Sequence, residues 1–240
     1  MRILTWNLER GFHGRKQVIG QQQDRLKEIG ADIAVLTEVP APMSILQEGL
    51  VLSPVQRAQG RLELEAWVGI AATGCQAVGQ ALPFARMAAA AQVVLEGEPF
   101  LVYGSVLPWR GALHQAKYLS SDEFENSAGL FKRILCEQVE DMKALKEQFR
   151  SHSLIWAGDF NQSLSGPNYV GSKAGQELLS SALEDLDLEA WNKDCEHSIP
   201  GLSAIDLICG PKGRKHKVER FAPDHHSTTL SDHAGYIVEL

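Results

Sequence analysis

The sequence is poor in cysteine and contains no long hydrophobic run. Its four cysteines lie far apart and none forms a C-x-x-C pair, so a disulfide framework is not expected. No apolar stretch approaches the roughly 18 residues needed to cross a membrane. The N-terminus lacks the long apolar centre and the cleavage site of a signal peptide. These absences predict a cytoplasmic protein with no membrane span.

A zinc site is one alternative for the cysteines and histidines. It would draw on residues toward the C-terminal end of the sequence: Cys195, His197, His225 and His226. No pair of these ligands has a recognised zinc spacing. Reduced thiols and loop histidines are therefore the favoured interpretation.

Basic residues are outnumbered by acidic ones. Lys and Arg total 23 against 30 Asp and Glu, which gives a formal net charge of −7 and a pI near 5.6. A protein that binds duplex nucleic acid mainly through its phosphates usually has the opposite balance. A phosphate-bearing substrate stays possible, because a divalent metal can supply positive charge locally. The charge balance counts only against tight non-specific DNA binding.

Length and composition are those of an ordinary globular protein. The chain has 240 residues, of which 44% are hydrophobic and 22% charged. Such a chain buries about three-quarters of its unfolded surface, so it needs no metal or disulfide to fold. No internal repeat, low-complexity linker or break in composition divides it. The sequence predicts one domain over residues 1–240.

Short apolar segments alternate with longer amphipathic ones. Helices are expected over residues 15–30, 122–149 and 172–186, where apolar residues recur at helical spacing. Gly97-Glu98 fits a hairpin turn. The strands are expected at residues 2–8, 33–36, 62–72, 92–96, 100–107, 153–157, 204–209, 217–221 and 235–240. Many strands with interspersed helices predict an α/β fold with mixed sheets.

Polar side chains gather at the ends of these strands, where open α/β sheets place their active sites. The segments are distant in the sequence, but neighbouring strands would bring them together. The set comprises Asn7, Glu38, Asp159, Asn161, Asp206, Asp232 and His233.

Four of these residues suit a metal and a proton-transfer group. Glu38 and Asp232 offer hard oxygen ligands, which suit Mg²⁺ or Mn²⁺ rather than zinc. His233 can accept a proton or donate to a phosphoryl oxygen if a carboxylate fixes its tautomer. Asp206 is the natural candidate for that carboxylate.

The segment Gly158-Asp159-Phe160-Asn161 adds two further polar groups. Asp159 can orient or deprotonate a water, and Asn161 can donate to charge that builds on a phosphoryl oxygen. Asp-Phe-Asn after a strand is also good turn chemistry. Alone, neither residue distinguishes catalysis from structure.

Together and in this order, the motifs resemble those of the endonuclease/exonuclease/phosphatase superfamily, which includes DNase I. The resemblance spans nearly the whole chain. It rests on Thr5-Trp6-Asn7, Leu36-Thr37-Glu38, Gly158-Asp159-Phe160-Asn161, Ser203-Ala204-Ile205-Asp206 and Ser231-Asp232-His233. The Gly-Asp-Phe-Asn and Ser-Asp-His motifs are highly specific as a pair, whereas any one of the shorter motifs would be weak alone.

The resemblance implies a four-layer α/β sandwich, with two mixed sheets face to face and helices outside. It also implies metal-dependent hydrolysis of a phosphoester. Carried over residue by residue, Glu38 binds the metal, with Asn7 and Asp232 beside it. Asp159 positions the attacking water, Asn161 stabilises the transition state, and His233 contacts the phosphate, oriented by Asp206. In this reading Asn7, Asn161 and His233 bind the phosphate.

One position departs from the family's pattern. The family usually has His or Tyr two residues before the Pro that ends the central strand, and this chain has Val106 before Pro108. Tyr103 has the wrong strand parity to replace it. Trp109, Arg110 or His114 would have to reach in from the following loop.

The sequence predicts a Mg²⁺-dependent hydrolase that cleaves a phosphodiester and is nuclease-like. Its expected partner is a phosphate-bearing substrate, and nucleic acid is one candidate. Two alternatives stay open: a phosphomonoesterase acting on a nucleotide, inositol or lipid phosphate, and a non-catalytic binding protein, which Val106 makes plausible. The basic run from Lys212 to Arg220 is read as a solvated hairpin, with a phosphate-steering rim as the alternative.

Overall fold

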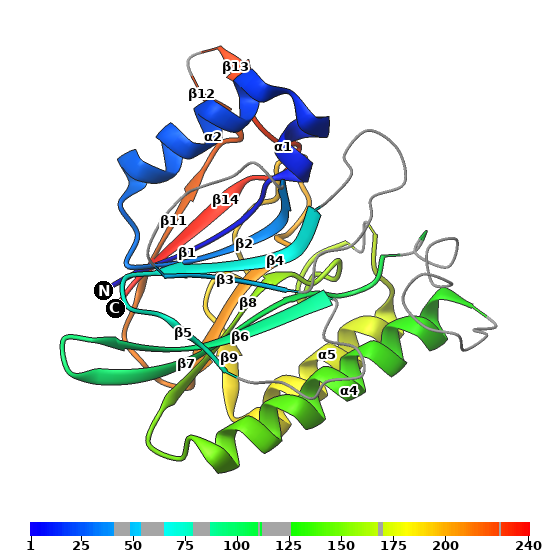
Figure 1. Ribbon diagram of the computed structural model, residues 1–240. Coiled ribbons are helices and arrows are strands. Elements are labelled where there is room, and N and C mark those ends of the chain that lie inside the picture. The colour runs from blue at the N-terminus through cyan, green and yellow to red at the C-terminus, as the bar shows by residue number, and fades with distance from the viewer. Residues whose placement is uncertain are drawn as a thin grey trace.

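The computed structural model describes residues 1–40, 49–53, 65–78, 87–109, 111, 126–167, 170–225 and 227–240. Two six-stranded mixed sheets pack face to face, and helices cover the outer face of each (Figure 1). This is the predicted four-layer α/β sandwich. No helix in the described part of the chain is long and apolar enough to span a membrane.

The first sheet has the strand order β11-β14-β1-β2-β4-β3. Strand β1 runs parallel to β2, and every other pairing in this sheet is antiparallel. Its strands are β1 (Arg2–Asn7), β2 (Ile33–Pro40), β3 (Leu50–Leu52), β4 (Glu65–Ala72), β11 (Lys217–Phe221) and β14 (Gly235–Glu239).

The second sheet has the strand order β5-β6-β7-β8-β10-β9. Here β7 runs parallel to β8, and the other pairings are antiparallel. Its strands are β5 (Gln76–Ala77), β6 (Ala88–Leu95), β7 (Glu98–Val106), β8 (Ser153–Asp159), β9 (Leu188–Ala190) and β10 (Asp206–Pro211). A separate two-stranded ribbon joins β12 (Asp224–His225) to β13 (Thr228–Thr229).

Two pairs of helices form the outer layers. Helices α1 (Glu9–Gly14) and α2 (Lys16–Ile29) cover the first sheet, and α4 (Ser127–Gln148) and α5 (Lys173–Leu186) cover the second (Figure 1). The Ser172 hydroxyl caps α5 by accepting from the backbone N–H of Gly175 at 3.0 Å. Gly30 ends α2 in the left-handed conformation, with φ of 59°.

The main core lies between the two sheets and under α4 and α5. Its largest fully buried side chains include Trp156, Tyr103 and Phe100. The sheets approach so closely at Gly104 that an added Cβ would lie 2.5 Å from Cγ1 of Val68 on the facing sheet. Only glycine fits there, and the close approach brings the strand ends of both sheets together.

Several element boundaries differ from the sequence-based expectation. The β6–β7 turn consists of Glu96 and Gly97, with φ of 52° and 84°, because Leu95 pairs with Glu98. Two successive left-handed residues are typical of a type I′ hairpin, so the expectation of a Gly97-Glu98 turn was wrong. Strand β6 also starts at Ala88 rather than at Gln92.

The structure describes only part of the helix expected over residues 122–149 and of the strand expected over residues 62–72. Helix α4 begins at Ser127, and its cap is Asn126, whose side chain accepts from the backbone N–H of Gly129 at 2.9 Å. The first residues of the helix expected over 122–149 lie outside the described part, as do residues 62–64 of an expected strand.

Candidate active site

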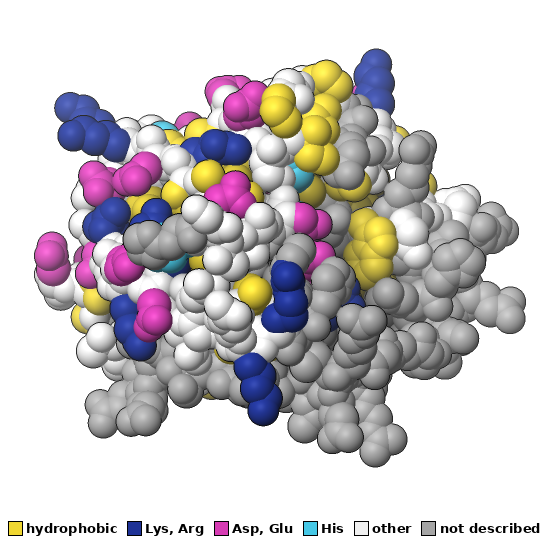
Figure 2. Space-filling model, turned by 90° about the horizontal axis from the view of Figure 1, so that it is seen from above, with side chains coloured by type: hydrophobic (Ala, Val, Ile, Leu, Met, Phe, Trp, Pro, Cys, Tyr) yellow, Lys and Arg dark blue, Asp and Glu magenta, His cyan; other side chains and the backbone are white. Residues whose placement is uncertain are grey.

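Polar residues from the strand ends of both sheets lie at one edge of the sandwich. Strands β1 and β8 end there at Asn7 and Asp159, while β10 starts there at Asp206 because it runs antiparallel to β8. Strand β14 runs antiparallel to β1, so the residues before Gly235 lie at this edge too. Figure 2 shows a face on which acidic side chains lie near histidine and hydrophobic side chains.

Asn7 and Asp159 connect the two sheets directly. Nδ2 of Asn7 donates to Oδ2 of Asp159 at 3.0 Å, and both residues are buried. Oδ1 of Asn7 accepts from the backbone N–H of Glu9 at 2.8 Å. The amide of Asn7 therefore holds Asp159, and its oxygen keeps one further lone pair.

A tight turn presents Asp159 and Asn161 together. Gly158 has a φ of 137°, and an added Cβ would lie 2.0 Å from the backbone oxygen of Ser105, so no other residue fits. Oδ1 of Asp159 accepts from the backbone N–H of Asn161 at 3.0 Å, and Nδ2 of Asn161 donates to the backbone oxygen of Leu107 at 3.0 Å. Asn161 has a φ of 49°. Asn tolerates this left-handed conformation better than most residues.

Burial and charge alter the protonation of Asp159. Burial, and after it the nearby carboxylate of Asp206, raises the pKa of Asp159 to about 7, while His233 and the Asn161 N–H act in the opposite direction. A carboxyl with a pKa near neutrality can accept a proton and release it again at physiological pH.

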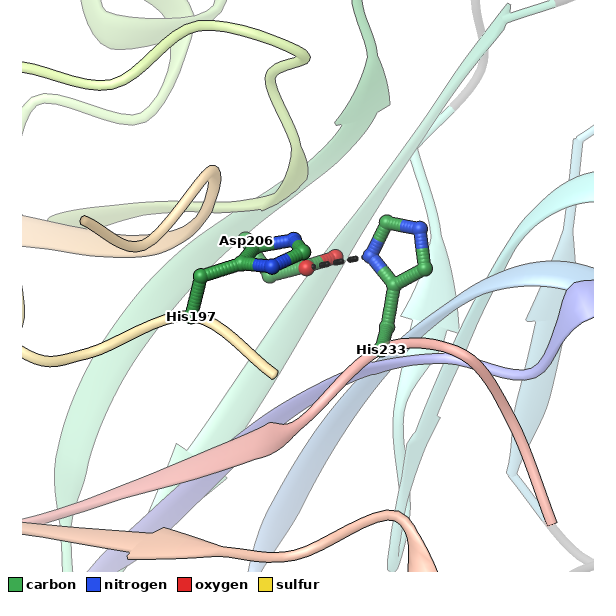
Figure 3. A group of neighbouring side chains, drawn as sticks. All are labelled: His197, Asp206 and His233. Atoms are coloured by element: carbon green, nitrogen blue, oxygen red, sulfur yellow. Dashed lines mark hydrogen bonds and ion pairs between the residues drawn. The ribbon is translucent and has the colours of Figure 1, made fainter. Parts of the chain in front are cut away.

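Asp206 and His233 form a close pair. Oδ2 of Asp206 lies 2.6 Å from Nδ1 of His233, and Asp206 is fully buried (Figure 3). Burial by itself lowers the pKa of His233, but the carboxylates of Asp206, Asp159 and Asp232 outweigh it and raise that pKa well above its ordinary value. The pair fixes Nδ1 of His233 as the donor to Asp206.

The turn that carries His233 is tied to β1. The hydroxyl of Ser231 donates to the backbone oxygen of Asn7 at 2.7 Å and accepts from the N–H of His233 at 3.0 Å. The indole N–H of Trp6 donates to the backbone oxygen of His233 at 3.1 Å. These hydrogen bonds hold the end of β1 against the turn that carries His233.

Glu38 and Asp232 belong to an acidic group beside this cluster. Glu38 lies in β2 with a φ of 50°, and its Oε2 is 3.0 Å from Nε of Arg10. Burial, and after it the charges of Asp232 and Glu38, raises the pKa of Glu9 to about 7. The three carboxylates act on one another electrostatically, although among the described residues their oxygens do not all lie within 4.8 Å of one another. Carboxylate oxygens are the ligands that Mg²⁺ and Mn²⁺ prefer.

Glu9 was not among the residues expected at the site. It lies at the start of α1, a helix that the sequence did not predict, with a φ of 45°. The signal was its position two residues after Asn7. This closeness to Asn7 in the sequence does not place Glu9 at the site unless the conformation of the turn after β1 is known.

Val106 gives no polar group to the site. It is 1% exposed and pairs with Asp159, which in turn pairs with Asp206 across β7, β8 and β10. Tyr103 is buried on the opposite side, as its parity predicts, where burial and Asp141 raise its pKa well above the ordinary value. Arg110 and His114 lie outside the described residues.

His197 is a second residue that was not expected at the site. It lies between β9 and β10, and its ring stands 5.6 Å from the ring of His233 in a T-shaped arrangement. One possible ligand atom each from His197, Asp206 and His233 lies within 4.8 Å of the others. Burial, more than any other effect, lowers the pKa of His197. Among the described residues, this group does not include Cys195 or His225 of the zinc alternative, and His226, its fourth member, lies outside the described residues.

A recess of about 160 Å³ adjoins Asn161. It lies between the N-terminal ends of α4 and α5, and both aromatic and polar side chains face it. Its lining includes Pro108, Trp109, Phe131, Asn161, Gln162 and Ser172. Trp109, one of the residues considered as a substitute for Val106, therefore lies on the Asn161 side of the site.

The basic hairpin between β10 and β11 is paired with acidic residues and backbone carbonyls. Lys212 contacts Glu184 at 2.7 Å, and Arg214 forms a two-bond contact with Glu98. Arg220 donates to the backbone oxygens of Glu196 and His197. The pairing of Lys212 and Arg214 with carboxylates of this chain favours the solvated hairpin over the phosphate-steering rim.

No protein-family model matches the sequence, and no curated protein matches it. Solved structures do match over almost the whole chain. A 3'-5' exonuclease from Neisseria meningitidis has a TM-score of 0.69 at 19% identity and covers 100% of this chain and 99% of its own. The human Nocturnin catalytic domain has a TM-score of 0.67 at 14% identity, with 99% and 92% covered.

A third structure carries the family name itself. It is an endonuclease/exonuclease/phosphatase family protein from Leptotrichia buccalis, with a TM-score of 0.66 at 16% identity, and it covers 100% of this chain and 99% of its own. The fold of this chain is therefore the DNase I-like fold of the endonuclease/exonuclease/phosphatase superfamily.

Proposed function

We propose that the protein is a metal-dependent phosphoesterase that cleaves a phosphodiester. The observation that carries the proposal is the convergence of Asn7, Asp159, Asp206 and His233 from four separate segments into two hydrogen-bonded pairs, which lie side by side because Asp159 and Asp206 are partners on adjacent strands. Such groups at the end of a sheet are expensive to bury and are not needed for folding. The neighbours include proteins named as a 3'-5' exonuclease and as an endonuclease domain, which supports the same class of chemistry.

Three side chains would act on the phosphate. Asp159 accepts a proton from the attacking water, whose oxygen forms the new bond to phosphorus as the bond to the leaving oxygen breaks. Asn161 donates from its amide to a phosphoryl oxygen, and His233 donates from Nε2 to another. Asp206 holds the His233 ring in the tautomer that this requires. The leaving oxygen takes its proton from solvent.

Glu38, Asp232 and Glu9 would hold a divalent ion, with Asn7 beside them. When bound, the ion supplies Lewis-acid stabilisation of negative charge on the phosphate. The fit rests on the donor chemistry: Glu38, Asp232 and Glu9 offer carboxylate oxygens, which Mg²⁺ prefers as ligands. Arg10, which contacts Oε2 of Glu38 at 3.0 Å, would give up that contact to the ion. The same ion would offset the charge of an acidic protein toward its substrate.

The recess beside Asn161 favours a diester over a monoester. A phosphate at Asp159 and Asn161 has one substituent as leaving group, and a diester carries a second that needs its own space. The recess, with Trp109 and Phe131 in its lining, offers that space directly next to Asn161. Aromatic walls suit a nucleoside, because every base has a face that stacks on an aromatic ring.

Turnover of three substrates tests the proposal. Purified protein with Mg²⁺ or Mn²⁺ is expected to hydrolyse bis-p-nitrophenyl phosphate and a short single-stranded oligonucleotide faster than p-nitrophenyl phosphate. Asp159→Asn, which keeps the shape of the side chain, is expected to abolish that turnover. A preference for the monoester would make the protein a phosphatase. No turnover from a folded, metal-binding protein would make it the binding protein that Val106 allows.

A further inference from the structure

His197 is held rigidly in the segment between β9 and β10. Its backbone N–H donates to the oxygen of Leu202 at 2.8 Å, and its backbone oxygen accepts from Nη2 of Arg220 at 3.0 Å. The neighbouring Ser198 hydroxyl donates to the backbone oxygen of Asp232. The segment is thereby attached to the turn that carries His233, and the His197 side chain is placed against that turn.

The hydrogen bond at Nδ1 of His197 fixes the protonation of its ring. The backbone N–H of Ile199 donates to Nδ1 at 3.0 Å, and the hydroxyl oxygen of Ser198 lies 3.1 Å from the same nitrogen. A ring nitrogen that accepts from an N–H presents its lone pair and carries no proton. The ring is therefore neutral, and its single proton is on Nε2, which makes Nε2 a donor.

The carboxylate of Asp206 has an oxygen that such a donor would satisfy. Oδ2 of Asp206 is bonded to His233, whereas Oδ1 is buried and has no hydrogen-bond partner among the described residues. A ring nitrogen of His197 lies within 4.8 Å of a carboxylate oxygen of Asp206. Figure 3 shows the Asp206 carboxylate close to the His197 ring and directed toward His233. An unsatisfied buried carboxylate oxygen is costly.

We infer that His197 is a positioning residue: its neutral ring donates from Nε2 through one water to Oδ1 of Asp206, so that Asp206 is held from both sides. The inference rests on the proposed function for its catalytic consequence. With the carboxylate held at both oxygens, the ring of His233 keeps one orientation toward the phosphate. His197 itself does not touch the substrate in this role.

The same three residues also make a zinc donor set, because two imidazoles and one carboxylate are common zinc ligands. The tautomer argues against that use. To bind a metal through Nε2, a neutral His197 ring would need its proton on Nδ1, where it would face the N–H of Ile199. The hydrogen-bond donor is therefore the role that this geometry supports.

Three variants separate the donor from the ring. His197→Phe keeps an aromatic ring against His233 but has no donor, His197→Gln has a donor but no ring, and His197→Ala has neither. Loss of the hydrogen bond is expected to lower kcat about tenfold in the Phe and Ala variants, with KM within about twofold. His197→Gln is expected to recover most of kcat. Equal kcat in the wild type and the Phe variant would overturn the inference.

Nuclear magnetic resonance tests the geometry without any turnover. In the wild-type protein, ¹⁵N shifts are expected to show His197 protonated at Nε2 and not at Nδ1. The Nδ1 proton of His233 is expected to shift or broaden in His197→Phe. Protonation of His197 at Nδ1, or stoichiometric Zn²⁺ binding that His197→Phe abolishes, would make the three residues a metal site instead. Because these signals need no substrate, they decide the role of His197 even if no phosphoesterase activity is found.

Discussion

Oδ2 of Asp206 lies 2.6 Å from Nδ1 of His233, and the two residues come from different sheets of the sandwich. Asp206→Asn replaces the carboxylate with an amide that no longer enforces the Nδ1–H tautomer of His233. We expect kcat to fall a hundredfold or more, since a positioned proton-transfer group contributes about 10²–10⁴-fold. Kinetics with a diester measures this loss, and calorimetry is expected to give a Mg²⁺ affinity within about twofold of the wild type. Asp24→Asn, on the exposed face of α2, is the matched control; an unchanged rate in Asp206→Asn would mean that other contacts orient His233.

Asn161 combines a polar side chain with a left-handed backbone, and two substitutions separate these properties. Asn161→Gly removes the amide and tolerates the φ of 49°. We expect it to lower kcat about 10²–10³-fold, the typical effect of one lost donor to an oxyanion. Asn161→Ala removes the same amide and adds about 1–2 kcal/mol of backbone strain, so it should melt at a lower temperature than the Gly variant. If Asn161→Gly retains full activity in a folded protein, Asn161 has a structural role only.

Glu38 is expected to dominate divalent-ion binding. Glu38→Gln keeps the length of the side chain and removes its charge, so calorimetric titration with Mg²⁺ or Mn²⁺ should show an affinity at least tenfold weaker. Glu177→Gln, an exposed change on α5, is the control and should bind like the wild type. Equal affinities in Glu38→Gln and the wild type would place the ion elsewhere.

Asp141 makes stability depend on pH far from the site. Burial raises its pKa to about 6, although the Tyr103 hydroxyl acts in the opposite direction. Because the folded pKa lies above the unfolded one, the folded state binds this proton more tightly, and the resulting stability is complete below about pH 4. It is lost as the pH rises toward 6 and beyond. Urea unfolding should therefore show Asp141→Asn gaining stability over the wild type between pH 4 and 7.

An exposed residue on the same helix provides the control for that measurement. Glu140→Gln removes a carboxylate that contacts Lys143 at the surface, and such pairs contribute little. Its stability difference from the wild type should stay nearly constant over the same pH range. A flat difference for Asp141→Asn as well would show that Asp141 ionises normally in the folded protein.

The sequence predicted those parts of the fold whose signals are local. An unbroken apolar run such as the one starting at Ile33 reads as a buried strand, and Ser172 is recognisable as a helix cap. The start of β6 was missed because four consecutive alanines, beginning at Ala88, favour a helix by intrinsic propensity. Pairing with β7 overrides that preference, and pairing is not visible from the segment itself.

The same distinction applies to the candidate site. Asp159, Asp206 and His233 belong to sequence motifs that occur together and in a characteristic order. The structure brings these three residues together as expected. His197 and Glu9 belong to no such motif. Their place at the site depends on the path of a loop and on an unpredicted short helix, and both are consequences of tertiary packing.

The geometry of the candidate site depends on the alignment of the two sheets, which approach each other closely at Gly104. Asn7 and His233 are carried by one sheet, Asp159 and Asp206 by the other, and the bonds Asn7–Asp159 and Asp206–His233 cross the interface. A methyl group at Gly104 would press on Val68 and Val35, well inside the core. A shift of one sheet against the other would then lengthen both hydrogen bonds at once. Substitutions in the core between the sheets are therefore expected to disturb the site at the edge of the sandwich. The tolerance to such substitutions should be lowest where the two sheets lie nearest each other.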